Sequence, residues 1–383
     1  MLSPRDIETA VSRKIITAAQ RDALLKLSLA DSQSSEAAET PDEELRLVGG
    51  GNDIFVTIGI LLFLAGATFA LSSIFTNGPG PIVGIAALSI LVIAQIVTRQ
   101  RRMRLSSTVL AVLFMGCAAY FVWLGVGSQV DVAALQSNPL AIFSLRGTAG
   151  WLSLAGTAAF VGVAAGYFWR FKVPVLAAII ALALTGFAFI QTGLFLYDGV
   201  IAGTVQVPMA DQLPAVLRNA LYMPLICGLI VFGIAVKLDL HDRERRTVWS
   251  DCAFWLHVVS APLLVHPLFI MATGQSLGGA SIAPGFDAVI GLVVLIAVFT
   301  YVALAIDRRS LLVPTLGYFG TLGVQNLVGN TATSAGIPPI ALVLVTVGAL
   351  VIMFGAGWQH IRHVVVSKTL PTSVLERLPP IKI

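Results

Sequence analysis

Charged side chains are scarce in this chain. Asp, Glu, Lys and Arg make up 11% of its 383 residues, whereas hydrophobic residues make up 57%. A soluble globular domain carries about 25% charged residues, so this composition excludes that class. The apolar runs are continuous and do not alternate with polar residues, which favours membrane-spanning helices over the strands of a barrel.

Two further absences narrow the reading. The three cysteines, Cys117, Cys227 and Cys252, lie in or at the ends of apolar stretches and show no pairing pattern, so we expect neither a disulfide framework nor a metal site. The first 48 residues contain no apolar core segment. We therefore expect no cleavable signal peptide.

What the chain does contain is long apolar stretches. A helix needs about 20 mostly apolar residues to cross the ~30 Å hydrocarbon core of a bilayer. About ten stretches qualify, which predicts an all-α fold: a polytopic integral membrane bundle of about ten transmembrane helices. They cover about 54–76, 80–98, 106–126, 148–168, 174–196, 219–237, 251–273, 287–306, 311–330 and 339–357.

Basic residues concentrate on one side of this predicted bundle. Of the 24 Lys and Arg residues, six lie in the N-terminal segment, sixteen in the loops after even-numbered stretches and in the C-terminal tail, and two (Arg146 and Arg218) in the other loops. The positive-inside rule then predicts that both termini are cytoplasmic. The basic loops carry Arg99, Arg101, Arg102 and Arg104; Arg170 and Lys172; Lys237, Arg243, Arg245 and Arg246; and Arg308 and Arg309.

The placement of this charge also indicates the partner. The net charge of +4 comes from residues that flank spans, where topology and anionic lipid headgroups explain them. No basic stripe with interleaved aromatic residues occurs, so we expect the lipid bilayer and no nucleic acid as a partner. The oligomeric state is left open.

The N-terminal segment differs from the rest. Thr17 and Gln20 match a capping box, and two short apolar stripes predict a cytoplasmic helical hairpin within residues 1–30. It is too small to be stable alone, so residues 4–29 are a candidate docking element for a protein partner. Residues 31–51 form a predicted flexible linker with six acidic residues, residues 52–358 the ten-helix domain, and residues 359–383 a short cytoplasmic tail.

Few polar side chains lie inside the predicted spans. No Asp, Glu, Lys or Arg falls at a predicted mid-membrane position, and Asp53, Asp251 and Asp287 lie at span ends. Either Asn52 or Asp53 is expected to cap the first span. The seventh and ninth spans hold a polar set that lines a cavity in one reading and makes only interhelical hydrogen bonds in the other: His257, His266, Tyr318, Gln325, Asn326 and Asn330.

Catalytic chemistry has weak support. Residues 274–278 match the G-x-S-x-G pattern, but that motif requires a preceding strand, and an apolar span precedes it here. We expect no catalytic, cofactor-binding or metal-binding residues and no cofactor, and we expect that the chain is not an enzyme.

Three segments carry a resemblance. Residues 5–20, the segment Asn52–Gly59 after an acidic linker, and residues 242–246 leading into Trp255 and His257 resemble uncharacterised bacterial multi-pass membrane proteins of the domain-of-unknown-function type. The resemblance implies a bacterial inner (plasma) membrane protein. Two functional hypotheses follow: a non-enzymatic scaffold, sensor or assembly factor, and a transporter or lipid-handling protein with a polar cavity between the seventh and ninth spans.

Overall fold

A computed structural model describes residues 51–76, 78–129, 146–204, 220–242, 247–273, 286–312 and 339–375, and positions 17, 20, 21, 245, 317, 378 and 379. Every element of these residues is a helix. The helices are α3 (Gly51–Ile74), α4 (Gly80–Ala94), the π-helix η1 (Gln95–Gln100), α5 (Arg104–Gly127), α7 (Arg146–Phe171), α8 (Val175–Ile201), α10 (Tyr222–His241), α11 (Val248–Thr273), α12 (Phe286–Ile306), the 3-10 helix η3 (Arg309–Leu311), α14 (Pro339–Thr369) and α15 (Thr372–Leu375).

Eight of the described helical segments are long and apolar enough to cross a membrane. The chain is therefore a multi-pass membrane protein, as its composition predicts. Seven of these segments match the first seven predicted spans to within about five residues. The eighth predicted span coincides with α12, the ninth lies almost wholly outside the described residues, and the tenth is part of a longer helix, α14.

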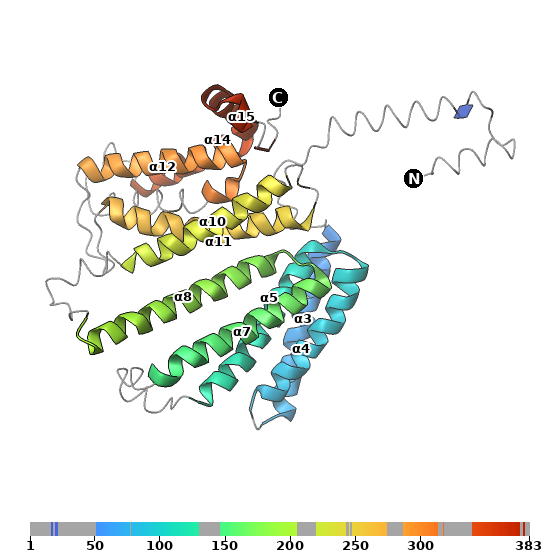
Figure 1. The fold of residues 1–383 in the computed structure, drawn as a ribbon. Coiled ribbons are helices and arrows are strands. Elements are labelled where there is room, and N and C mark those ends of the chain that lie inside the picture. The colour runs from blue at the N-terminus through green and yellow to red at the C-terminus, as the bar shows by residue number, and fades with distance from the viewer. Residues whose placement is uncertain are drawn as a thin grey trace. The chain divides into compact units, whose positions relative to one another are not determined.

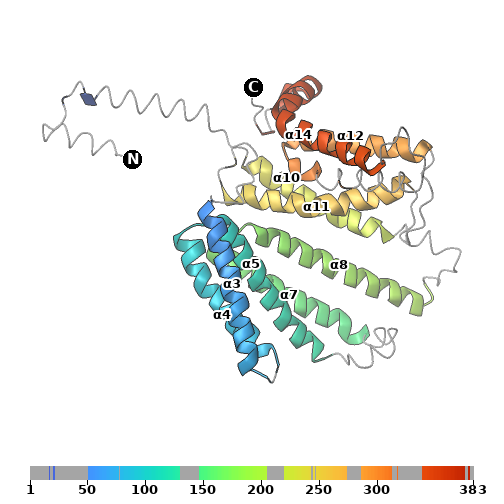
Figure 2. The same ribbon diagram turned by 180° about the vertical axis from the view of Figure 1, so that it is seen from behind.

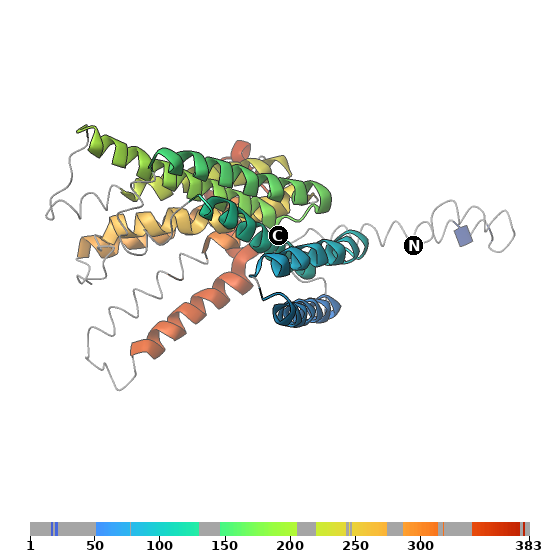
Figure 3. The same cartoon turned by 90° about the horizontal axis from the view of Figure 1, so that it is seen from below.

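The helices within residues 45–383 pack largely against their neighbours in sequence. α3, α4, α5, α7 and α8 follow one another (Figures 1 and 2), and α10 and α11 form the most extensive antiparallel pair. α11 contacts α8, α12 and η3, and α12 contacts α14. In the view of Figure 3, α10 and α11 remain side by side. The turns between η1 and α5, α7 and α8, and α10 and α11 lie toward the right of Figure 1, at one end of the helices.

These three turns and the turn after α12 share a backbone feature. Arg102, Lys172, Arg245 and Asp307 have φ of 53°, 55°, 54° and 56°, so one residue of each predicted basic loop, or beside it, adopts the left-handed conformation. After α12 this residue completes a Schellman motif, with the Arg308 amide donating to the Ala303 carbonyl at 2.9 Å. This conformation costs a non-glycine residue roughly 1–2 kcal/mol. It allows the chain to reverse direction within a short turn.

One acidic residue holds two of these helices together. Asp53 is only 1% exposed, and its carboxylate accepts the Leu105 amide at 2.9 Å and the Ser106 amide at 3.0 Å. The prediction that Asn52 or Asp53 caps the first span is therefore wrong, because Asp53 caps a different helix. Asp53 lies in the first turn of α3 and caps the N-terminus of α5, because the two helices begin at the same end of the bundle.

The compact unit Met1–Glu44 is described at three positions only. The Thr17 amide donates to Gln20 Oε1 at 2.9 Å, and the Gln20 amide donates to Thr17 Oγ1 at 3.3 Å. These two reciprocal bonds confirm the capping box predicted from the sequence. The remainder of the predicted hairpin and the linker lie outside the described residues.

Candidate functional site: a buried ionic cluster

The predicted polar set of the seventh and ninth spans is only partly placed. His257 is fully buried in α11, and His266, nine residues later, is exposed. Tyr318, Gln325, Asn326 and Asn330 lie outside the described residues, as does the G-x-S-x-G segment at 274–278. The predicted cavity between these two spans therefore stays a prediction.

His257 instead leads to a group of charged residues. Its Nε2 lies 2.8 Å from Oδ2 of Asp239, which is in the last turn of α10 and 4% exposed. The Phe232 ring packs edge-on against the imidazole at a centroid distance of 5.4 Å. Nδ1 of His257 has no hydrogen-bond partner among the described residues. The imidazole is thus held between one carboxylate and an aromatic ring.

Asp239 has a second partner, Arg308, from the turn after α12. Arg308 Nε donates to Asp239 Oδ2 at 3.0 Å, and its Nη2 donates to Oδ1, so the guanidinium grips the carboxylate at two points. The same Nη2 also donates to the Ser250 carbonyl at 3.1 Å and to the Ser250 hydroxyl at 3.2 Å. Arg308 thereby joins α10, α11 and the end of α12.

A second carboxylate extends the network to α14. Asp307 accepts the indole N–H of Trp358 at 2.7 Å, and its other oxygen lies 3.3 Å from Arg245 Nη1 and 3.7 Å from Arg362 Nη1. Arg245 Nη2 also donates to the Asp307 carbonyl at 2.8 Å. We call Asp239, Arg245, His257, Asp307, Arg308, Trp358 and Arg362 together the buried ionic cluster.

Arg362 anchors the C-terminal tail to this cluster. It is fully buried, and its Nε donates to the Leu304 carbonyl of α12 at 3.0 Å. Its Nη2 donates to the carbonyl of Pro379 at 2.7 Å. The guanidinium of Arg309 lies over the Trp358 ring, 5.4 Å from its centroid. A residue 17 positions after Arg362 is therefore part of the same packed unit.

The charged groups of the buried ionic cluster bind one another, as in a structural ion-pair network. Both oxygens of Asp239 are engaged, and no cluster residue lines the pocket described below. A buried ion pair adds little net stability, but removing one partner leaves an uncompensated charge and costs about 3–5 kcal/mol. The cluster therefore connects α10, α11, α12 and α14 through bonds whose loss would be costly.

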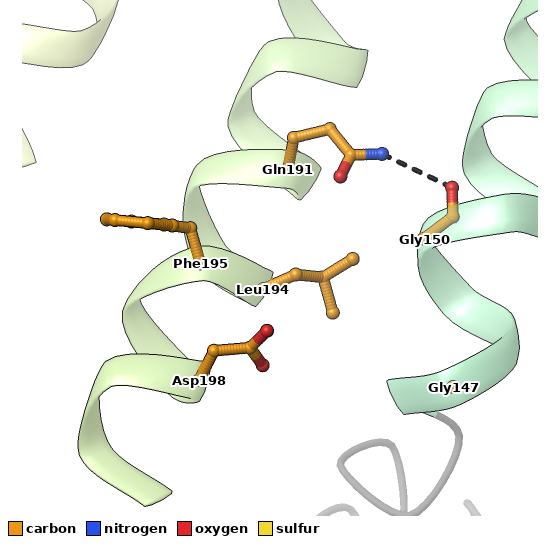
Figure 4. A pocket seen from close by; sticks show the side chains of 6 residues that line it. All are labelled: Gly147, Gly150, Gln191, Leu194, Phe195 and Asp198. Carbon is orange, nitrogen blue, oxygen red and sulfur yellow. Dashed lines mark hydrogen bonds between the residues drawn. The ribbon is translucent and has the colours of Figure 1, made fainter. Parts of the chain in front are cut away.

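A pocket of about 510 Å³ lies elsewhere, between the first turns of α7 and the last turns of α8. Gln191, Leu194 and Asp198 of α8 point toward α7 in Figure 4, and Gln191 Nε2 donates to the Gly150 carbonyl at 3.2 Å. Gly147 and Gly150 leave room on the α7 side. The pocket combines an amide and a carboxylate with apolar walls.

Sequence reasoning missed most of the buried ionic cluster. The predicted sixth span ends at residue 237, whereas α10 continues to His241 and so includes Asp239. The predicted tenth span ends at residue 357, whereas α14 continues to Thr369 and includes Arg362. A span predicted from mean hydropathy ends where charged residues begin. Charged residues that pair with each other across helices are therefore assigned to loops. No group of three or more His, Cys, Asp or Glu residues that could hold a metal ion occurs in the described part of the chain.

Comparisons with protein-family models, with curated proteins and with solved structures find no match to this chain.

Proposed function

We propose that this protein is a non-enzymatic membrane scaffold or assembly factor of the bacterial inner (plasma) membrane, with both termini in the cytoplasm. The observation that carries the proposal is the buried ionic cluster. Its carboxylates form ion pairs and hydrogen bonds with guanidinium, imidazole and indole groups of neighbouring helices. These charged groups therefore contribute to the packing of the helices. A bundle whose helices are connected by buried ion pairs suits a protein that presents fixed surfaces to its partners.

An ion-coupled transporter has different requirements. A proton or sodium relay needs an intramembrane carboxylate that reaches water in turn from each side. Asp239 is 4% exposed, and it is held by Arg308, whose guanidinium keeps its charge in proteins. This pairing favours a structural role for Asp239.

The N-terminal segment supplies the docking element of the proposal. The capping box at Thr17 and Gln20 supports a helix beginning there, and residues 4–29 carry two apolar stripes too short to fold stably alone. We propose that they bind a cytoplasmic protein partner, with residues 31–51 as the tether.

The alternative is a transporter or lipid-handling protein. The pocket between α7 and α8 favours it, because Gln191 and Asp198 offer polar groups beside apolar walls near the ends of two spans. This alternative also includes the predicted polar cavity between the seventh and ninth spans, which His266 and the polar residues of the ninth span would line.

Carbodiimide labelling distinguishes the scaffold from a proton-coupled transporter that uses Asp239. Dicyclohexylcarbodiimide enters membranes and reacts with protonated carboxyl groups, so we expect no modification of Asp239 in native membranes, as judged by peptide mass spectrometry. Unfolded protein serves as the positive control. Modification of Asp239 that rises as the pH falls would contradict the scaffold and support a proton-coupled transporter.

A deletion tests the docking element separately. Removing residues 1–48 should leave insertion intact and abolish crosslinks between the chain and a cytoplasmic protein in intact cells. The matched control replaces residues 31–44 with a neutral linker of equal length, and we expect its crosslinks to persist. Unchanged crosslinking of the deleted protein would reject residues 4–29 as the docking element.

A further inference from the structure

Six basic residues lie on or beside two turns at the same end of the bundle. The turn between η1 and α5 carries Arg101 and Arg102, with Arg99 just before it in η1 and Arg104 just after it at the start of α5. The turn between α7 and α8 carries Lys172, with Arg170 just before it in α7. The Arg170 guanidinium donates to the Gln95 side-chain oxygen of η1, which holds the two turns side by side. All six residues except Arg170 are exposed. We call these six residues the basic patch.

The basic patch has no counter-charge among the described residues of these helices. Residues 51–201 contain three acidic residues, Asp53, Asp131 and Asp198. The carboxylate of Asp53 is buried against the amides of α5, Asp198 lies near the other end of α8, and Asp131 is outside the described residues. Arg170 bonds the neutral Gln95 amide and lies 5.3 Å from the Phe171 ring centroid, and Lys172 Nζ lies 5.4 Å from the Phe168 ring centroid. At the same end of the bundle, Asp242 follows α10 and accepts the Thr247 amide and hydroxyl, and the exposed Asp251 lies two residues after Trp249. Six basic residues therefore outnumber the acidic residues described at this end, which leaves the patch with a positive charge that favours an anion.

Aromatic residues place this patch at the level of lipid headgroups. Trp169, next to Arg170, is 78% exposed, and Trp249 at the start of α11 is 48% exposed. The Phe168 ring lies 6.0 Å from the Trp249 ring, so the two tryptophans belong to the same end of the bundle. Tryptophan gathers at membrane–water interfaces. The exposed apolar residues Val92 and Ile96 lie one to three turns before the basic turn, where acyl chains would contact them.

We propose that the basic patch binds the headgroup of an anionic phospholipid, with the lipid phosphate between the two turns. Guanidinium groups suit this ligand because their N–H forks match phosphate oxygens. The N-terminus of α5 is excluded as the phosphate site, since Asp53 already accepts its Leu105 and Ser106 amides. The arginine side chains must therefore provide the recognition.

Native mass spectrometry of the full chain in a neutral detergent tests this site. The probes are phosphatidylglycerol and phosphatidylcholine with identical acyl chains, each titrated separately, and inorganic phosphate as a competitor. The variant Arg101→Gln/Arg104→Gln is compared with Lys237→Gln/Lys368→Gln, which removes the same charge from two other exposed positions. Arg102 is left unchanged because of its left-handed backbone.

We expect the unaltered chain to retain phosphatidylglycerol in preference to phosphatidylcholine. The patch variant should bind phosphatidylglycerol roughly 30-fold more weakly, and the control variant should change by less than about threefold. Equal binding of the two lipids, or equal loss in the two variants, would overturn the proposal. Displacement of phosphatidylglycerol by inorganic phosphate would identify a site for a free anion instead. All four altered side chains are exposed, so both variants should keep the thermal midpoint of the unaltered chain.

Discussion

Single residues explain how so apolar a chain accommodates buried charge. Asp239 and Asp307 each collect two or more donors from segments that are far apart in the sequence. Each partner makes the burial of the other tolerable, because an isolated ion in an apolar medium is far more costly than a paired one. Substitution of one partner is therefore the sharpest probe of the buried ionic cluster.

Asp239→Asn should lower the free energy of unfolding by about 3–5 kcal/mol, because Arg308 stays buried without its carboxylate. Thermal unfolding in detergent measures the change. The control is Lys237→Gln on the same helix, where the side chain is exposed and a change within about 0.5 kcal/mol is expected. Equal midpoints for the two variants would show that the buried ionic cluster does not stabilise the fold.

A glycine marks the closest approach of α10 and α11. A Cβ atom on Gly228 would lie 3.0 Å from Leu263 Cβ and 3.1 Å from the Leu263 carbonyl carbon, whereas one on Gly233 would meet nothing within 4 Å. Gly228→Ala should therefore destabilise the protein by about 1–3 kcal/mol through overpacking. Gly233→Ala, the matched control in α10, should be neutral or stabilising by up to about 1 kcal/mol. The same unfolding experiment compares them, and identical shifts would reject the close approach.

At the scale of elements, the described helices are joined at one end by side chains and by short turns. The buried ionic cluster joins α10, α11, α12 and α14, while Asp53 joins α3 to α5 and Arg170 joins α7 to η1. Left-handed residues keep the intervening turns short, so that side chains from successive helices can reach each other.

Asp53→Ala should weaken the start of α5, because the amides of Leu105 and Ser106 lose their acceptor. A lost N-terminal cap costs about 0.5–2 kcal/mol, and the effect should appear as faster hydrogen exchange at these two amides. Asp53→Asn should retain part of the protection through its side-chain oxygen. Ser128→Ala, at the other end of α5, is the control. Unchanged exchange at residues 105 and 106 in the Asp53→Ala protein would refute the capping role.

At the scale of the whole molecule, the alternating charge of the loops makes a prediction about topology. Every turn carrying a predicted basic loop should face the cytoplasm, and the turns at the other helix ends should face outward. Single cysteines at the exposed positions Arg101 and Ser128, in a protein lacking its three native cysteines, test the two ends of α5. A membrane-impermeant thiol reagent should label Ser128→Cys in intact cells and Arg101→Cys only after permeabilisation. The reverse pattern would invert the topology.

A structural feature of this protein was predictable when the residues that determine it are close together in the sequence. The first seven spans were predicted closely because each depends on its own apolar residues and on the thickness of the bilayer. The capping box at Thr17 was predictable for the same reason, since its partners are three residues apart. The role of Asp53 was not, because its target amides lie 52 and 53 residues away.

The sequence by itself therefore determined that this is a helical multi-pass membrane protein, where most of its spans lie, and which of its loops are basic. Only the tertiary structure decided that Asp239 pairs with His257 and Arg308, which are 18 and 69 residues distant. The physical reason is that hydropathy is a local property of one helix in a bilayer. Ion pairing depends on which helices become neighbours, and only packing determines that.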